Sequence, residues 1–278
     1  MSPEPHRGLE WLSRIAVPAM IILVAVSMTI ATSDAGGLSG LLTITSTDNM
    51  TVAAAITLVF GTFVSGGTQA TNWTRFAKSG KTAVFATLLA FFLGNGLMTL
   101  IGAFGALVYQ QADIVDIMVT QGLATLGILM LFLNLWTTQD NTVYNFAIAG
   151  CNLVRTRRRK LVTIAGAAIG TVLAVMGMYE WLIPFLILLG TFIPPIGGVI
   201  MASYFVGYKR QYPALGEVTL PAFNVTGLAA YAIGSAAAYT SPWIAPIVGV
   251  LVAALSYSVI LVVSQGVRER RAQLMGAA

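Results

Sequence analysis

Residues 133–160 read LNLWTTQDNTVYNFAIAGCNLVRTRRRK, and their pattern indicates the class of fold. An apolar sequence with polar residues at its centre leads into the basic cluster at residues 155–160. The whole chain has the same character, since it is 57% hydrophobic and only 9% charged. Soluble domains carry about 25% charged residues, so the composition excludes a soluble globular protein.

The other Lys and Arg residues also gather in short clusters. Two apolar stretches separate each cluster from the next, and the turn between those two stretches carries acids or no charge. Lys and Arg stay on the cytoplasmic face during membrane insertion, so the pattern predicts a multi-pass protein of the cytoplasmic membrane with both termini cytoplasmic. Because the clusters flank apolar spans, we expect no nucleic-acid binding. The clusters are Arg7 and Arg14; Arg75, Lys78 and Lys81; Arg155, Arg157, Arg158, Arg159 and Lys160; Lys209 and Arg210; and Arg268, Arg270 and Arg271.

A membrane-spanning helix needs about 20 apolar residues, and the sequence predicts about eight such helices. The fourth apolar segment is too long for one crossing, so we expect its start, DIVDIMVTQG (113–122), to lie along the outer surface. The prediction is an all-α membrane protein with a single transmembrane domain over residues 1–278. The expected spans are residues 12–31, 51–74, 82–109, 117–153, 161–179, 182–206, 222–239 and 243–264.

The second span has small residues at its centre. Each glycine lowers helix propensity by about 1 kcal/mol, and Thr68 is a good N-cap after Gly66 and Gly67. We therefore expect the helix to break at residues 65–68. In lipid, the backbone groups of such a break must be satisfied by protein, water or a ligand. The alternative is an unbroken helix that uses its small residues for close helix packing.

The polar residues of the opening stretch form a stripe. Asn134, Thr137, Thr138 and Asn141 have the i, i+3, i+4, i+7 spacing of one helix face. Facing lipid would be costly, so the stripe should face a cavity, an ion or another helix. Asp140 would lie roughly 20 Å along the helix from the basic cluster. A carboxyl at that depth is a functional-site hypothesis, and the alternative for the stripe is interhelical hydrogen bonding.

The sixth span contains Pro194-Pro195. These residues remove two backbone donors, which predicts a kink. The kink can serve as a gate or as a purely structural bend, and the sequence does not favour either.

The sequence carries no enzyme signature that we recognise. It lacks a G-x-S-x-G elbow, an H-E-x-x-H motif and a P-loop. A lone His6 and a lone Cys151 exclude a His/Cys metal cluster drawn from this chain. We therefore predict a protein that is not an enzyme and that has no cofactor besides a coupling ion.

Five segments, in order along the chain, resemble the nucleobase–cation symporter family, which includes permeases for cytosine, hydantoins, allantoin and purines. The resemblance runs from about residue 12 to about residue 263 and is closest to the cytosine branch. The segments are GTFVSGGTQATNWTRF (61–76), AFFLGNGLMTLIGAFGA (90–106), ADIVDIMVTQGL (112–123), LNLWTTQDNTVY (133–144) and IPPIGGVIMASYF (193–205).

The resemblance implies a partial leucine-transporter-like fold. Members of the family have twelve helices with two inverted five-helix repeats, and they import a nucleobase together with a cation, which is Na⁺ in the best understood cases. This chain resembles helices five to twelve only. We therefore expect the C-terminal two-thirds of a transporter. Either the chain is a fragment or a mis-started open reading frame, or a second polypeptide supplies the remaining helices. The alternatives are a non-transporting membrane scaffold or partner subunit, and a permease for another purine, pyrimidine or hydantoin-like ring.

The resemblance also implies which residues bind cation and base. The Asn134 carbonyl and the Thr137 and Thr138 hydroxyls match sodium-site positions, and such oxygens suit a hard cation. Coupling to H⁺ through Asp140 is the alternative. The residues expected to contact a base such as cytosine are Thr62, Phe63, Ser65, Gly66, Gly67, Gln139, Asp140 and Asn141.

Overall fold

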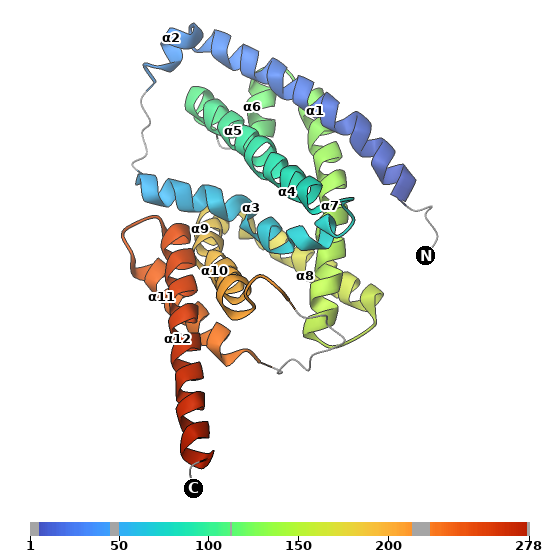
Figure 1. The fold of residues 1–278 in the computed structure, drawn as a ribbon. Helices are drawn as coiled ribbons and strands as arrows, with labels where there is room; N and C mark the ends of the chain where they lie inside the picture. The colour runs from blue at the N-terminus through green and yellow to red at the C-terminus, as the bar shows by residue number, and fades with distance from the viewer. Residues whose placement is uncertain (1–5, 45–49, 112, 213–222, 277–278) are drawn as a thin grey trace. The chain divides into compact units, whose positions relative to one another are not determined.

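The computed structural model describes residues 6–44, 50–111, 113–212 and 223–276, with the backbone alone for residues 6–13, 73, 140–141 and 265–276. The described residues contain helices and no strand, as the composition predicted (Figure 1). They divide into two compact units. The first unit comprises Met1–Asn49 and Lys78–Met178, and the second comprises Met50–Ala77 and Tyr179–Ala278.

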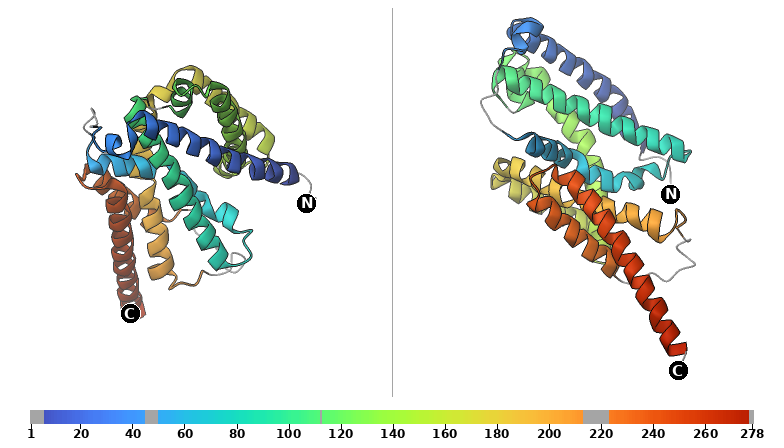
Figure 2. Two further views of the ribbon diagram at one scale, coloured as in Figure 1. Left: turned by 90° about the horizontal axis from the view of Figure 1, so that it is seen from above. Right: turned by 60° about the vertical axis from the view of Figure 1, so that its left-hand side comes forward.

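The first unit begins with the long helix α1, and several other helices of the unit pack beside it. Helix α1 packs against α5, and the right-hand view of Figure 2 shows these two helices side by side. A π-helical segment, η1, joins α4 to α5 and overlaps the start of the second family-like segment. The elements are α1 (His6–Asp34), α2 (Gly37–Leu41), α4 (Gly80–Leu88), η1 (Leu89–Asn95), α5 (Gly96–Tyr109), α6 (Ile114–Thr120), α7 (Ala124–Leu153) and α8 (Arg159–Val175).

The short helix α6 forms the centre of the first unit's core. Ile117 and Met118 are 1% and 0% exposed, and Met118 packs with Val24 of α1 and Met130 of α7. The Asp113 carboxylate accepts a hydrogen bond from the Val115 N–H at 2.7 Å and so caps the helix. The start of the fourth apolar segment is therefore a separate helix, distinct from the long helix α7, as its length required.

The second unit contains α3 (Val52–Thr74) and the elements that follow η2 (Met178–Trp181). Its helices approach closely at small residues. A Cβ on Gly234 of α11 would lie 2.6 Å from the Ala253 Cβ of α12, so these helices meet backbone to backbone. The remaining elements are α9 (Leu182–Phe192), α10 (Pro194–Ala202), η3 (Ser203–Gly207), α11 (Val225–Thr240) and α12 (Ala245–Gly276).

The predicted kink in the sixth span is confirmed. Helix α9 ends at Phe192, Ile193 forms a bend, and α10 begins at Pro194 with the two prolines in its first turn. Proline is tolerated there because the first residues of a helix have no intrahelical acceptor for their N–H groups. The role of this bend in gating stays a prediction.

Five segments of the described residues are long and apolar enough to cross a membrane. The other predicted spans coincide with α7, which carries the polar stripe, and with α8 and α11, which have 17 and 16 residues. Large apolar side chains face outward, as at Ile21 (64% exposed) and Leu255 (66%), which suits a lipid surround and not water. The five segments are Arg14–Asp34, Val52–Asn72, Gly80–Tyr109, Met178–Gly207 and Ala245–Ser264.

Candidate substrate and cation site

The expected cation ligands lie on one helix, α7, in the first unit. The Thr137 hydroxyl donates to the carbonyls of Leu133 at 3.0 Å and Asn134 at 3.2 Å. The Thr137 hydroxyl and the Asn134 carbonyl are therefore neighbours on the helix surface. Oxygen ligands bind hard cations such as Ca²⁺ at about 2.3–2.6 Å. Two oxygens 3.2 Å apart can therefore contact one ion of that size.

The other polar residues of this part of α7 differ in their exposure to solvent. Asn134, Thr138 and Gln139 are exposed, whereas Thr137 is half-buried. The Thr138 carbonyl accepts a hydrogen bond from the Thr142 hydroxyl at 3.1 Å, so the turn stays helical through the polar residues. Asp140 and Asn141 belong to α7 by their backbone, but their side chains lie outside the described residues.

Neutral oxygens dominate this candidate cation site. Within the described part of the chain, no group of three His, Cys, Asp or Glu residues could hold a metal ion. A stripe of carbonyl and hydroxyl groups is suited to a hard monovalent or divalent cation and not to zinc or copper.

The predicted helix break at residues 65–68 is wrong, because α3 runs without interruption from Val52 to Thr74. The Thr68 hydroxyl donates to the Ser65 carbonyl at 2.8 Å inside that helix, so Thr68 is not an N-cap. A Cβ on Gly66 would lie 2.9 Å from the Phe63 ring, which shows that the ring covers this glycine. The continuous hydrogen-bond ladder outweighs the small propensity cost of each glycine.

Close packing explains the other small residues, as the alternative interpretation of this span proposed. A Cβ on Gly61 would clash with the Leu186 carbonyl of α9, and one on Gly190 of α9 would clash with the Thr57 carbonyl of α3. These contacts are between backbones, so no side-chain movement can relieve them. Glycine at both positions lets α3 and α9 touch within the second unit.

The expected base-binding residues of α3 remain accessible on the intact helix. Thr62, Phe63, Ser65 and Gly67 are exposed, while Gly66 is buried. The Thr62 hydroxyl donates to the Val59 carbonyl at 2.7 Å within the helix. Because α3 belongs to the second unit and α7 to the first, the shared pocket that the sequence predicted stays a prediction.

A polar network in the first unit was not foreseen from the sequence. The Ser27 hydroxyl of α1 donates to the Gln121 side-chain carbonyl at 2.7 Å. The Gln121 amide donates to the Ser27 backbone carbonyl at 2.9 Å and to the Tyr109 hydroxyl at 3.1 Å. Tyr109 in turn donates to Asp34 at 2.5 Å. Gln121 lies in the third family-like segment, but no spacing rule links it to Ser27, 94 residues away.

Comparisons with known proteins place these features in a family. Residues 6–260 match the family described as permease for cytosine/purines, uracil, thiamine, allantoin. The cytosine permeases of Escherichia coli O157:H7 and Escherichia coli K12 are each 38% identical to the chain over 253 residues. The aligned region covers 91% of this chain but 60% of each relative, so the chain spans about three-fifths of the length of the curated relatives it matches. Since the family match includes most of the chain, the protein belongs to the family of permeases for cytosine/purines, uracil, thiamine and allantoin.

Proposed function

We propose that the chain forms the larger part of a cation-coupled importer that carries a nucleobase across the cytoplasmic membrane. The observation that carries the proposal is the oxygen-rich stripe on α7, which is largely exposed in a chain that is 57% hydrophobic. A stripe of this kind in lipid is stable only beside a polar ligand, water or another helix. Cytosine is the favoured substrate because both relatives described above are cytosine permeases.

The proposed roles follow from the family resemblance and from the chemistry of the residues at the matching positions. The Asn134 carbonyl and the Thr137 and Thr138 hydroxyls would hold the coupling ion, which we propose is Na⁺. The α3 residues Thr62, Phe63, Ser65, Gly66 and Gly67, with Gln139, Asp140 and Asn141 of α7, would bind the base. Alternating access about a site near the bilayer midplane would complete the cycle.

Coupling between ion and base would follow from linkage. If the ion favours the conformation that binds the base, each raises the affinity of the other by the same factor. The base should therefore bind more tightly as Na⁺ increases. If Asp140 carries a proton instead, uptake should respond to pH in the absence of Na⁺.

The test uses a complete transporter that contains this chain, in cells without a cytosine permease of their own. Thr138→Ala should reduce Na⁺-dependent uptake of radiolabelled cytosine by about tenfold or more, since it removes a charge-binding oxygen worth roughly 1.5–3 kcal/mol. Thr171→Ala is the matched control, because the Thr171 hydroxyl of α8 is bonded to its own helix at 2.9 Å. Uptake by Thr138→Ala that matches the parent at low Na⁺ would overturn the cation site.

A second candidate is a scaffold or partner subunit that does not transport by itself. One observation favours it: the small residues of α3 serve helix packing. Cytosine uptake by the chain expressed alone, compared with the complete transporter, separates the two candidates. Competition by unlabelled purines, uracil and hydantoins then identifies the preferred ring.

A further inference from the structure

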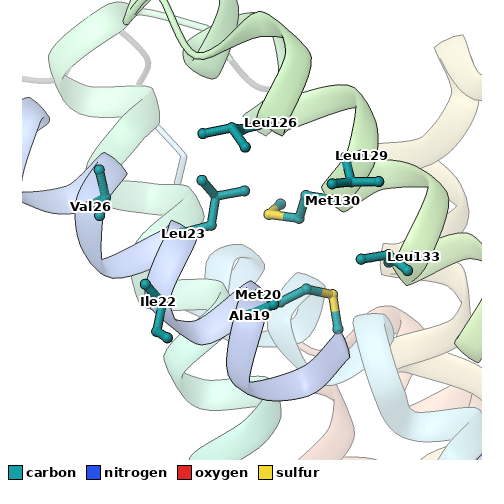
Figure 3. A pocket seen from close by; sticks show the side chains of 9 residues that line it. All are labelled: Ala19, Met20, Ile22, Leu23, Val26, Leu126, Leu129, Met130 and Leu133. Atoms are coloured by element: carbon teal, nitrogen blue, oxygen red, sulfur yellow. The ribbon is translucent and has the colours of Figure 1, made fainter. Parts of the chain in front are cut away.

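Two hollows of the first unit differ in their chemistry. The hollow between α1 and α7 is lined by apolar side chains alone and offers a charged ligand no partner (Figure 3). A second hollow, of about 410 Å³, lies where α7 ends and α8 begins, and it combines apolar, polar and cationic side chains. The residues that line this α7–α8 hollow are Ile148, Cys151, Asn152, Thr156, Arg157 and Arg159.

A defined turn holds the basic residues against the end of α7. The Thr156 N–H donates to the Cys151 carbonyl at 3.0 Å, and the Arg155 N–H donates to the Asn152 carbonyl at 3.4 Å. Arg155 has a φ of 52°, the left-handed conformation that this Schellman type of helix end requires. The Thr156 hydroxyl also accepts from the Arg158 N–H at 3.3 Å. The loop that carries the basic residues is therefore an ordered turn.

The charge around the α7–α8 hollow has one sign. Five of the six residues at 155–160 are Lys or Arg, and no Asp or Glu occurs from residue 141 to residue 179. Neither α8 nor the end of α7 therefore supplies a carboxylate to Arg157 or Arg159. A phosphate group suits such a pair, because a guanidinium can form two parallel hydrogen bonds to phosphate oxygens.

The apolar lining lies at the other end of the α7–α8 hollow. Ile148 precedes Asn152 by one turn, which is about 6 Å farther from the basic residues along the axis of α7. A Cβ on Gly150 would lie 2.6 Å from the Val162 side chain, so α7 and α8 touch at this level. A free phosphate ion would use the cationic end alone. An anionic phospholipid satisfies both ends, with its phosphate at the guanidinium groups and its acyl carbons at the apolar end.

We propose that the α7–α8 hollow binds the headgroup of one anionic phospholipid, such as phosphatidylglycerol. Arg157 and Arg159 hold the phosphate, Asn152 and Thr156 donate to the headgroup oxygens, and Ile148 contacts the start of an acyl chain. The hollow lies beside the basic cluster, at the end of α7 that the charge pattern predicts to meet the cytoplasmic membrane surface. This inference does not depend on the proposed function, since lipid binding is measured without transport.

Native mass spectrometry of the full chain in a neutral detergent tests the proposal. The probes are phosphatidylglycerol and phosphatidylcholine with identical acyl chains, so the two lipids differ only in their headgroups. We expect phosphatidylglycerol to bind more tightly by about tenfold or more, because its net charge is not cancelled within the headgroup. Equal affinities overturn the proposal. Glycerol 1-phosphate at the same concentration should leave the bound lipid in place, and its displacement of the lipid would overturn the choice of a phospholipid as ligand.

Two double variants remove the same charge from the same cluster. Arg157→Gln with Arg159→Gln removes the guanidinium groups that line the hollow, whereas Arg155→Gln with Arg158→Gln removes two that do not line it. We expect the first pair to weaken phosphatidylglycerol binding by about tenfold or more, through the loss of charge-assisted hydrogen bonds. The second pair should weaken it by about threefold or less, since exposed charges contribute little. Equal weakening would show that net charge alone attracts the lipid, and it would overturn the site.

A further comparison keeps every charge in place. Ile148→Trp fills the apolar end of the hollow, whereas Leu153→Trp enlarges a side chain of the same helix that is 85% exposed and does not line it. We expect Ile148→Trp to weaken phosphatidylglycerol binding by about fivefold or more, because the added ring takes the space of the lipid. Leu153→Trp should stay within about twofold of the parent. Equal binding by these two variants would show that the lipid does not enter the hollow.

Discussion

Gln121 joins three elements of the first unit through one side chain. Its carbonyl accepts from Ser27, and its amide group reaches both the Ser27 carbonyl and the Tyr109 hydroxyl. Both amide hydrogens are therefore used, which is the full donor capacity of a glutamine. Ser27 is 3% exposed, so loss of Gln121 leaves polar groups without compensation by water.

Gln121→Leu should destabilise the first unit by about 1–3 kcal/mol, because it leaves buried hydrogen-bonding groups without partners. The expected readout is a thermal-denaturation midpoint several degrees lower for the protein in detergent. Gln111→Leu makes the same substitution at an exposed site, where the side chain accepts one long contact of 3.5 Å from Thr120. Equal midpoints for the two variants would contradict the assigned role of Gln121.

At the scale of single elements, α3 and α9 depend on glycine for their contact. A methyl group on Gly61 meets the backbone of Leu186 and cannot be accommodated by rotation of a side chain. Gly61→Ala should therefore force the helices apart and cost about 1–3 kcal/mol, as overpacking does. The measurement is the thermal denaturation of the second unit, monitored through the protection of α3 against hydrogen exchange.

Gly197→Ala is the matched control, because nothing lies within 4 Å of a Cβ at that position of α10. Alanine there should be neutral or stabilise the helix by up to about 1 kcal/mol, through its higher helix propensity. If Gly61→Ala behaves in the same way, the close approach of α3 and α9 is not required.

The elements differ in how well their sequence predicts them. Hydropathy and proline act locally, so the long helices and the bend before Pro194 follow from the residues themselves. The glycine-rich centre of α3 led to the wrong prediction of a helix break. Its glycines instead allow a close approach to α9, at Gly61, and leave room for the Phe63 ring, at Gly66. The Ser27–Gln121 pair is 94 residues apart in sequence and has no local signal at all.

The candidate site was predictable to the same local extent. The spacing of Asn134, Thr137 and Thr138 identifies one helix face, and the 3.2 Å contact between Thr137 and Asn134 agrees with it. The second half of the pocket depends on how separate helices assemble, which residue spacing within one helix does not encode.

At the scale of the whole molecule, charge sets the expected orientation. The basic residues that follow α3 and α7 lie in the turns after these helices or in the first residues of the next helix, whereas Asp34 ends α1, Asp113 precedes α6 and Glu180 lies in η2. Alkaline phosphatase fused after Gln111 should therefore be active outside the cytoplasm, whereas a fusion after Arg157 should be inactive. Green fluorescent protein at these two sites should give the opposite pattern, and any other result contradicts cytoplasmic termini.

The joint at Ile193 has a mechanical consequence. Pro194 and Pro195 have no N–H to donate to the carbonyls of Gly190 and Thr191, so two helical hydrogen bonds cannot form across the joint. Rotation of α10 against α9 therefore sacrifices fewer bonds than the same rotation in an ordinary helix. We therefore expect α10 to reorient relative to α9 about Ile193 at a lower energetic cost than two halves of an uninterrupted helix.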